Sequence, residues 1–232
     1  MCGRFTSTAP ADILAEEFGL DAVASSYAPS FNIAPTHMVP VVTNWTRRSL
    51  ELFQWGLIPS WSKDRGSPGQ LINARSETVA TRAAFKEAFA KRRCLVLADG
   101  FYEWKNQVGT KVPMYIRLAS RRPFAFAGLW EGWLSPDGEV VRTCTILTTR
   151  PCDAVASIHD RMPVLLTADG REQWLDHDRT DREALRALMR PTAEPLEAYS
   201  VGTLVNSPAN DSDQCIAPEE PRGTLPLFPD WW

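Results

Sequence analysis

Short, predominantly apolar runs dominate the chain, and runs of this kind are typical of β-strands. Glycine, proline and short polar residues separate the runs and predict turns between them. Two Asp-Gly pairs, Asp99-Gly100 and Asp137-Gly138, predict tight turns between neighbouring strands. The predicted strands cover residues 38–43, 50–55, 94–98, 101–104, 114–118, 124–130, 140–148, 164–167 and 198–201.

Helical spacing of apolar residues is confined to a few segments. Residues 11–20 repeat apolar positions at Ile13, Leu14 and Phe18, which predicts a short amphipathic helix. Further helices are predicted at 81–93, 151–158, 169–176 and 180–190, and a proline-containing loop at 21–35. Because strands and helices do not alternate regularly, we predict an α+β fold with a curved, mostly antiparallel β-sheet, a barrel-like core and several peripheral helices.

The chain contains no internal repeat and no linker-like stretch, so we predict a single domain over residues 1–232. Its core would cover 1–205, and residues 206–232, rich in proline and acidic residues, would form a C-terminal tail. The 232 residues are 44% hydrophobic and 23% charged, as in ordinary soluble globular proteins. No apolar run reaches about 18 residues and no secretory signal begins the chain, which indicates a cytoplasmic protein.

The spacing of the cysteines and the distribution of charged residues restrict the class of protein further. The five cysteines are widely spaced without a Cys-x-x-Cys pair, which favours reduced thiols over disulfides or a metal site. We therefore expect no metal and no cofactor. Residues 1–130 hold 16 Lys/Arg against 10 Asp/Glu, whereas residues 131–232 hold 9 against 18. A basic first half is compatible with an anionic partner, although the two halves could simply pair their charges.

The first five residues, Met1-Cys2-Gly3-Arg4-Phe5, carry unusual chemistry. If Met1 is removed, Cys2 becomes a 1,2-aminothiol whose amine can condense with an aldehyde and whose thiol can close a thiazolidine ring. An α-amine with a pKa of about 7.7–8.0 is partly neutral at physiological pH. The alternative is that Cys2 is an ordinary residue near a start codon.

Three other segments place polar groups in reactive settings. Asn73 and Arg75 share a face if residues 71–77 are extended, although an asparagine here could merely satisfy turn backbone. Glu103 stands between Tyr102 and Trp104, which would desolvate its carboxyl group and raise its pKa unless the strand turns it to water. His159, two residues before Arg161, could transfer protons near neutral pH.

Six segments in this order resemble the motifs of the SRAP (SOS response-associated peptidase) family, whose members are abasic-site processing proteins. The resemblance covers about residues 1–205. The segments are Met1-Cys2-Gly3-Arg4-Phe5, Asn32-Ile33-Ala34-Pro35, Trp55-Gly56-Leu57-Ile58-Pro59-Ser60-Trp61, Ile72-Asn73-Ala74-Arg75-Ser76-Glu77, Asp99-Gly100-Phe101-Tyr102-Glu103-Trp104 and Ile158-His159-Asp160-Arg161-Met162-Pro163.

The resemblance implies a self-processing peptidase that removes Met1 and a lyase-type, crosslinking activity on DNA. Cys2 would form a thiazolidine with the ring-opened aldehyde of an abasic site in single-stranded DNA. Asn73 would position the Cys2 amine, Glu103 would act as acid and base, and His159 would assist proton transfer at the sugar. The residues implied to hold phosphates or bases are Arg4, Pro35, Trp61, Arg75, Thr148 and Arg161.

As partners the resemblance implies single-stranded DNA containing abasic sites, a monomeric protein and association with the nucleoid. One departure from the family pattern is Ser62, because members can carry a second tryptophan directly after the position of Trp61. Two other functions stay open. One is an N-terminal-nucleophile cysteine peptidase or amidohydrolase acting on other proteins. The other is a non-catalytic module that binds single-stranded DNA.

Overall fold

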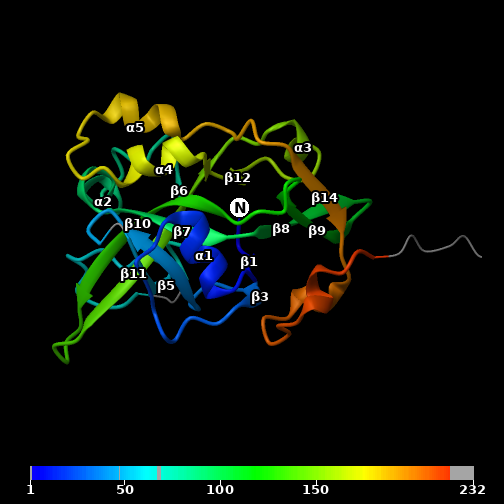
Figure 1. Ribbon diagram of the computed structural model, residues 1–232, viewed down its shortest axis with the longest axis horizontal. Coiled ribbons are helices and arrows are strands. Elements are labelled where there is room, and N and C mark those ends of the chain that lie inside the picture. The colour runs from blue at the N-terminus through cyan, green and yellow to red at the C-terminus, as the bar shows by residue number, and fades with distance from the viewer. Residues whose placement is uncertain (1, 47, 67–68, 220–232) are drawn as a thin grey trace, which may run out of the picture.

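A computed structural model describes residues 2–46, 48–66 and 69–219, and Figure 1 shows two β-sheets with short helices around them. The predicted α+β class is confirmed. The strands are β1 (Phe5–Ser7), β2 (Ala22–Val23), β3 (Ser30–Ile33), β4 (Met38–Thr43), β5 (Ser49–Trp55), β6 (Asn73–Arg75), β7 (Arg93–Ala98), β8 (Gly100–Gln107), β9 (Thr110–Leu118), β10 (Phe124–Leu134), β11 (Val140–Thr149), β12 (Met162–Pro163), β13 (Leu165–Leu166) and β14 (Leu196–Ser200). The helices are α1 (Ala11–Phe18), α2 (Lys86–Lys91), α3 (Asp153–Ala156), α4 (Ala168–Leu175), α5 (Arg182–Leu188) and the 3₁₀ turns η1 (Thr203–Asn206) and η2 (Asp213–Ile216).

The larger sheet closes on itself. Strands β5, β4, β7, β10 and β11 pair in that order, each antiparallel to the next. β11 then returns to β5 in parallel register, with Cys144 opposite Trp55. The ring of pairings removes the free edges that an open sheet would present. A curved, mostly antiparallel, barrel-like core is therefore confirmed.

The second sheet has the order β14-β9-β8-β1-β3, and all its pairs are antiparallel. The chain passes from the barrel into this sheet at Asp99, between β7 and β8. The predicted hairpin at Asp99-Gly100 is therefore wrong, because β7 pairs with β4 and β10 whereas β8 pairs with β1 and β9. Gly100 serves close packing instead, since a Cβ there would lie 2.1 Å from the Tyr115 hydroxyl oxygen.

Other predicted elements are confirmed or corrected locally. The turn at Asp137-Gly138 joins β10 to β11, and Gly138 has a φ of 85°. The segment 21–35 is not all loop, because it contributes β2 and β3 as sheet edges. The helix predicted over 81–93 is shorter in the structure and consists of α2 alone, Lys86–Lys91. The residues before it form successive turns, in which the Thr81 hydroxyl donates to the Thr78 carbonyl and so competes with helical bonding.

The N-terminal strand packs into the barrel core. The Phe5 ring makes edge contacts with Trp55 and Phe126, at centroid distances of 5.1 and 5.6 Å. Cys2 belongs to the same buried apolar cluster. This packing fixes the beginning of the chain at the junction of the two sheets, with the label N at the centre of Figure 1. Within the described ranges, no helix is long and apolar enough to span a membrane.

Candidate active site

Four residues that are far apart in the sequence meet where the two sheets join: Cys2, Asn73, Glu103 and His159. In the antiparallel pairing of β1 with β8, Phe5 lies opposite Phe101, and the Tyr102 amide donates to the Arg4 carbonyl at 3.0 Å. If this pairing is followed past Phe5 toward the N-terminus, the residues that precede β1 lie beside Glu103. Asn73 begins β6, and His159 lies in the loop between α3 and β12.

Asn73 is the direct link to residue 2. β6 pairs in parallel with β11, where Asn73 lies opposite Ile146. From there its side-chain Nδ2 donates a hydrogen bond of 2.7 Å to the carbonyl oxygen of Cys2. Its Oδ1 is buried and accepts no hydrogen bond from the residues that the structure describes. Because a buried acceptor without a donor is costly, Oδ1 offers a ready place for an additional N–H group.

Glu103 is a buried carboxyl group, with 2% of its surface exposed. Its neighbours Phe101 and Tyr102 are fully buried, so both faces of β8 are covered here and Glu103 does not turn to water. Burial raises the pKa of Glu103 to about 7, and the negative charge of Asp160 adds to that rise. Near neutral pH this carboxyl group is therefore present in both protonation states, which is the requirement for a general acid and base.

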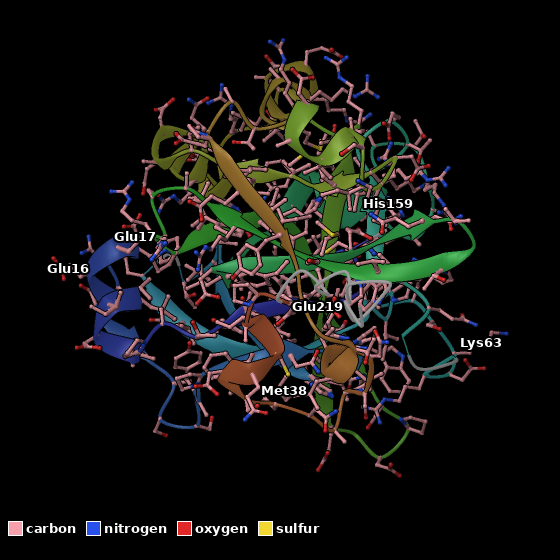
Figure 2. The ribbon with its side chains drawn as sticks, turned by 90° about the vertical axis from the view of Figure 1, so that its right-hand side faces the viewer. Glu16, Glu17, Met38, Lys63, His159 and Glu219 are labelled. Atoms are coloured by element: carbon pink, nitrogen blue, oxygen red, sulfur yellow. The ribbon has the colours of Figure 1, made fainter. Side chains whose placement is uncertain are left out.

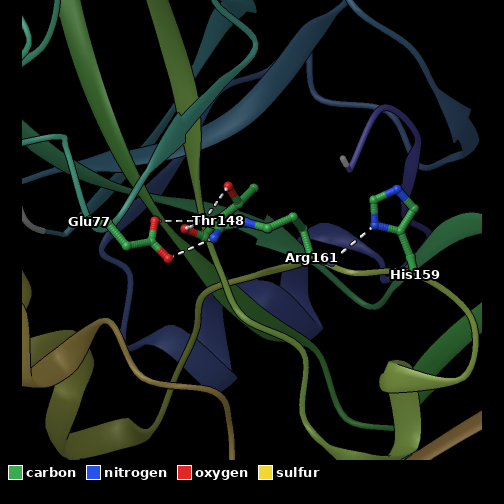
Figure 3. Close-up of polar contacts among 4 residues, drawn as sticks. All are labelled: Glu77, Thr148, His159 and Arg161. Atoms are coloured by element: carbon green, nitrogen blue, oxygen red, sulfur yellow. Dashed lines mark hydrogen bonds and ion pairs between the residues drawn. The ribbon is translucent and has the colours of Figure 1, made fainter.

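His159 lies next to this carboxyl group, with Nε2 3.8 Å from Glu103 Oε2. Its Nδ1 accepts a hydrogen bond of 3.0 Å from the Arg161 amide (Figure 3), so in neutral His159 the proton sits on Nε2. Burial lowers the pKa of His159, which favours that neutral form. Asp160 Oδ1 lies 2.9 Å from the same Nδ1 and can accept from it when the ring is protonated.

Arg161 and Thr148 form a polar group beside the four residues. The Arg161 guanidinium makes two contacts with the Glu77 carboxylate, at 2.6 and 3.0 Å, and donates to the Thr148 carbonyl at 2.6 Å (Figure 3). Arg161 also holds the pKa of Glu77 below its usual value. The parallel pairing of β6 with β11 places the exposed Arg75 opposite Thr148, which is itself buried.

Cys2 itself is fully buried. Its Sγ lies 3.9 Å from the Arg4 carbonyl oxygen, and burial, with the nearby Glu103 charge, raises the pKa of the thiol well above its usual range. In this chain, in which Met1 precedes Cys2, the Cys2 thiol therefore has no contact with solvent. Cys2 is nevertheless close to Asn73 and Glu103. The Asn73 side chain donates a hydrogen bond to the Cys2 carbonyl oxygen, and the Glu103 charge acts on the Cys2 thiol.

Arg4, Pro35 and Trp61 lie apart from this cluster. The Arg4 guanidinium turns inward, where Nη1 donates to Asn32 Oδ1 at 2.7 Å and to the Val205 carbonyl at 2.6 Å. Trp61, 63% exposed, lines a cavity of about 290 Å³. Pro35 adjoins that cavity, because a Cβ on its lining residue Gly69 would lie 3.3 Å from Pro35 Cβ.

An open cleft of about 770 Å³ leads to Glu103 and His159. Figure 2 faces the side of the molecule that carries His159. The other walls come from the β8–β9 hairpin, the loop after α3 and the C-terminal segment; the lining residues are Trp104, Asn106, Lys111, Ile158, Asp160 and Asn206. Among the described residues, no group of three or more His, Cys, Asp or Glu side chains could hold a metal ion.

Two contributors to this region carried no role in the sequence interpretation. Glu77 closes the motif around Asn73, and an acidic residue two positions after Arg75 could have suggested an ion pair. Asn32 opens the motif that ends in Pro35, but the carbonyls to which its side-chain nitrogen donates lie 173 to 178 residues away in the chain. No local pattern could have predicted those contacts.

Comparison with known proteins agrees with the geometry. The family profile described as SOS response associated peptidase (SRAP) matches residues 1–208. The chain is 42% identical over 221 residues to the abasic site processing protein YoqW of Bacillus subtilis, covering 93% of this chain and 99% of that one. It is 33% identical over 228 residues to the abasic site processing protein HMCES of Gallus gallus, covering 84% and 67%.

A solved structure of a protein from Bacteroides thetaiotaomicron superimposes with a TM-score of 0.85 at 26% sequence identity, covering 94% of this chain and all of that one. The fold, the six motifs and the family match over nine-tenths of the chain all indicate the same family. The chain belongs to the SOS response associated peptidase (SRAP) family.

Proposed function

We propose that this protein processes abasic sites in single-stranded DNA by forming a covalent thiazolidine through Cys2, after it has removed its own Met1. The observation that carries the proposal is the convergence of Asn73, Glu103 and His159 on residue 2, next to an open cleft. Relatives named abasic site processing proteins support the choice of substrate.

The first step is hydrolysis of the Met1–Cys2 peptide bond. A water molecule attacks the Met1 carbonyl carbon, and the Glu103 carboxylate accepts its proton. The protonated carboxyl group then returns a proton to the Cys2 nitrogen as the C–N bond breaks. A pKa of about 7 suits both halves of this transfer near neutral pH. Until that bond breaks, Cys2 has no free amine and a buried thiol, so residue 2 cannot form a thiazolidine with an aldehyde.

The second step joins the new amine to the sugar. Glu103 and His159 move a proton from the anomeric hydroxyl to the ring oxygen of the abasic sugar, which opens the ring to an aldehyde. The Cys2 amine adds to the aldehyde carbon and water leaves, giving an imine. Cys2 Sγ then adds to the imine carbon while its proton passes to nitrogen, closing the thiazolidine. Asn73 Oδ1, buried and without a donor among the described residues, would accept from the amine and orient it.

DNA would reach this centre along the exposed side of β6. Arg75 and Arg161 would contact phosphates, with Thr148 and Glu77 holding the Arg161 side chain in place. Trp61 would stack on a base and Pro35 would line the adjoining turn. The inward hydrogen bonds of Arg4 favour a structural role for that residue over a phosphate contact.

The test is the intact mass of the purified protein before and after mixing with an oligonucleotide that carries one abasic site. We expect a protein lacking Met1 and an adduct equal to both masses less one water. Cys2→Ala should form no adduct, whereas Cys152→Ala, which changes a half-buried thiol elsewhere, should react like the wild type. An adduct on Cys2→Ala, or on a chain with an uncleaved extension before Cys2, would refute the proposal. Turnover of peptides in trans without an adduct would favour the peptidase alternative.

A further inference from the structure

The C-terminal segment crosses the face that carries the cleft (Figure 2). We call residues 203–218 the strap; it contains η1 and η2, and Val205 and Cys215 are buried in a cluster with Tyr102. Asn206 of the strap lines the same cleft as Glu103 and accepts a hydrogen bond of 2.9 Å from Trp104 Nε1. One wall of the candidate active site is therefore supplied by the strap.

Asn32 holds the strap in place. Its side chain is 1% exposed, and Nδ2 points at three strap carbonyls, those of Val205, Ser207 and Asn210, at 3.3, 3.0 and 2.6 Å. The peptide groups of a 3₁₀ turn and the residues after it leave carbonyls without partners. The two hydrogens of this buried amide are shared among the three carbonyls; the Val205 carbonyl also accepts from Arg4, and the Ser207 carbonyl from the Asn210 amide. Asn32 is thus one buried group that contacts the strap at three places.

The oxygen of the same Asn32 side chain contacts Arg4, near the beginning of the chain. Asn32 Oδ1 accepts from Arg4 Nη1 at 2.7 Å, and Arg4 Nη1 also donates to the Val205 carbonyl. The Arg4 guanidinium lies 5.9 Å from the Trp104 ring centroid. The Arg4 carbonyl in turn accepts a hydrogen bond from the Tyr102 amide, and Arg4 is two residues from Cys2 in the chain. The side chain of Arg4 is thus tied to the strap, and its main chain is tied to the strand that carries Glu103.

We propose that Asn32 is a positioning residue: with Arg4 it forms a clasp that locks the strap and the N-terminal segment 2–4 into one arrangement with Glu103. This inference rests on the proposed function, because it names what holds the reacting groups in register. A shift of about 1 Å in such a group can lower a rate by roughly a hundredfold. Breaking the clasp should therefore slow the chemistry more than it weakens DNA binding.

Two substitutions separate the halves of the clasp. Asn32→Asp keeps an oxygen for Arg4 but loses the donor to the strap carbonyls, whereas Asn32→Ala loses both. Asn44→Ala is the matched control: Asn44 is also buried, and it bonds to the Lys91 carbonyl and the Arg93 amide in the barrel. It should lower thermal stability without touching the site.

The first measurement is the rate of crosslinking at saturating abasic DNA, together with the affinity for the same strand without an abasic site. We expect both Asn32 variants to lose about tenfold or more in the saturating rate, with affinity within about twofold of wild type. Asn44→Ala should keep the wild-type rate. Wild-type rates in both Asn32 variants, or equal slowing in Asn44→Ala at matched stability, would overturn the clasp.

Hydrogen exchange keeps this test independent of the proposed function. In both Asn32 variants, amide exchange should rise in the strap and also at Tyr102, whose amide bonds to Arg4. Faster exchange in the strap alone would show that the strap and residue 4 are not coupled, and would overturn the inference. If wild-type protein forms no adduct, the proposed function fails, while the exchange data still decide whether the clasp exists.

Discussion

Replacing Glu103 by glutamine should stabilise the folded protein at alkaline pH while abolishing its chemistry. Glutamine has nearly the same shape and stays neutral, so it removes the cost of burying a charge without opening a cavity. Because burial raises the pKa of Glu103 to about 7, folding favours its protonated form. The wild type therefore loses stability as pH rises from the ordinary glutamate pKa near 4.3 through about 7.

The magnitude follows from linkage. Each pKa unit corresponds to about 1.4 kcal/mol, so a carboxyl group moved from about 4.3 to about 7 costs roughly 4 kcal/mol above pH 7 and almost nothing below pH 4. For a chain of this size, roughly 4 kcal/mol corresponds to about 8–16 °C in melting temperature. The variant should accordingly melt like wild type at low pH and several degrees higher at pH 8.

Thermal unfolding across pH 4 to 8 measures this difference, and intact mass measures retention of Met1 and loss of the adduct. Glu131→Gln provides the matched control, because Glu131 is equally buried but lies 2.7 Å from Arg92. Removing that carboxylate leaves the Arg92 guanidinium with only the more distant Glu87 carboxylate, at 3.8 Å, so this control should melt lower at pH 8. A Glu103→Gln variant that melts below wild type at pH 8 would refute the reasoning, as would one that still forms adduct at the normal rate.

Three further outcomes are expected. Arg161→Ala should lower the slope of log affinity against log salt for single-stranded DNA by about 0.7, and an unchanged slope would contradict a phosphate contact. Trp61→Ala should weaken that binding by roughly 1–3 kcal/mol without changing the melting temperature, whereas Trp45→Ala, equally exposed at another turn, should bind normally; equal effects would argue against stacking at Trp61. Gly100→Ala should destabilise by about 1–3 kcal/mol or more because its Cβ would lie 2.1 Å from the Tyr115 hydroxyl oxygen, and a wild-type melting curve would contradict that packing.

The strand and helix pattern was largely readable from the sequence because most strands are short, predominantly apolar runs bounded by turn residues. β4 and β10 begin at the predicted residues, and α1 ends two residues before its predicted end. Errors arose where tertiary contacts decide. At Asp99-Gly100 the local signal is that of a hairpin. There the Asp99 carboxylate instead accepts from Thr6 and Thr8 in the strand of the second sheet, and the chain continues forward.

For the candidate site, the sequence predicted the desolvation of Glu103 but not the burial of Cys2. Asn73, Glu103 and His159 were named from their chemistry and from motif order, and the structure brings them to residue 2. Sequence gave no indication that Cys2 would be fully buried, because exposure depends on how β1 packs against the barrel. Nor could it indicate that Arg4 bonds to Val205, since that contact joins residues 201 positions apart.

Burial of the reacting groups explains why processing and crosslinking would occur in order. A thiol without solvent contact and an amide nitrogen in place of an amine give residue 2 no means of forming a thiazolidine with an aldehyde. Before hydrolysis, the α-amine of the chain already offsets part of the rise in the Glu103 pKa that burial causes. Hydrolysis of the Met1–Cys2 bond would transfer the free α-amine to residue 2, where the thiol could close a ring on the same aldehyde carbon. The order of the two reactions would thus follow from one change in covalent structure at residue 2.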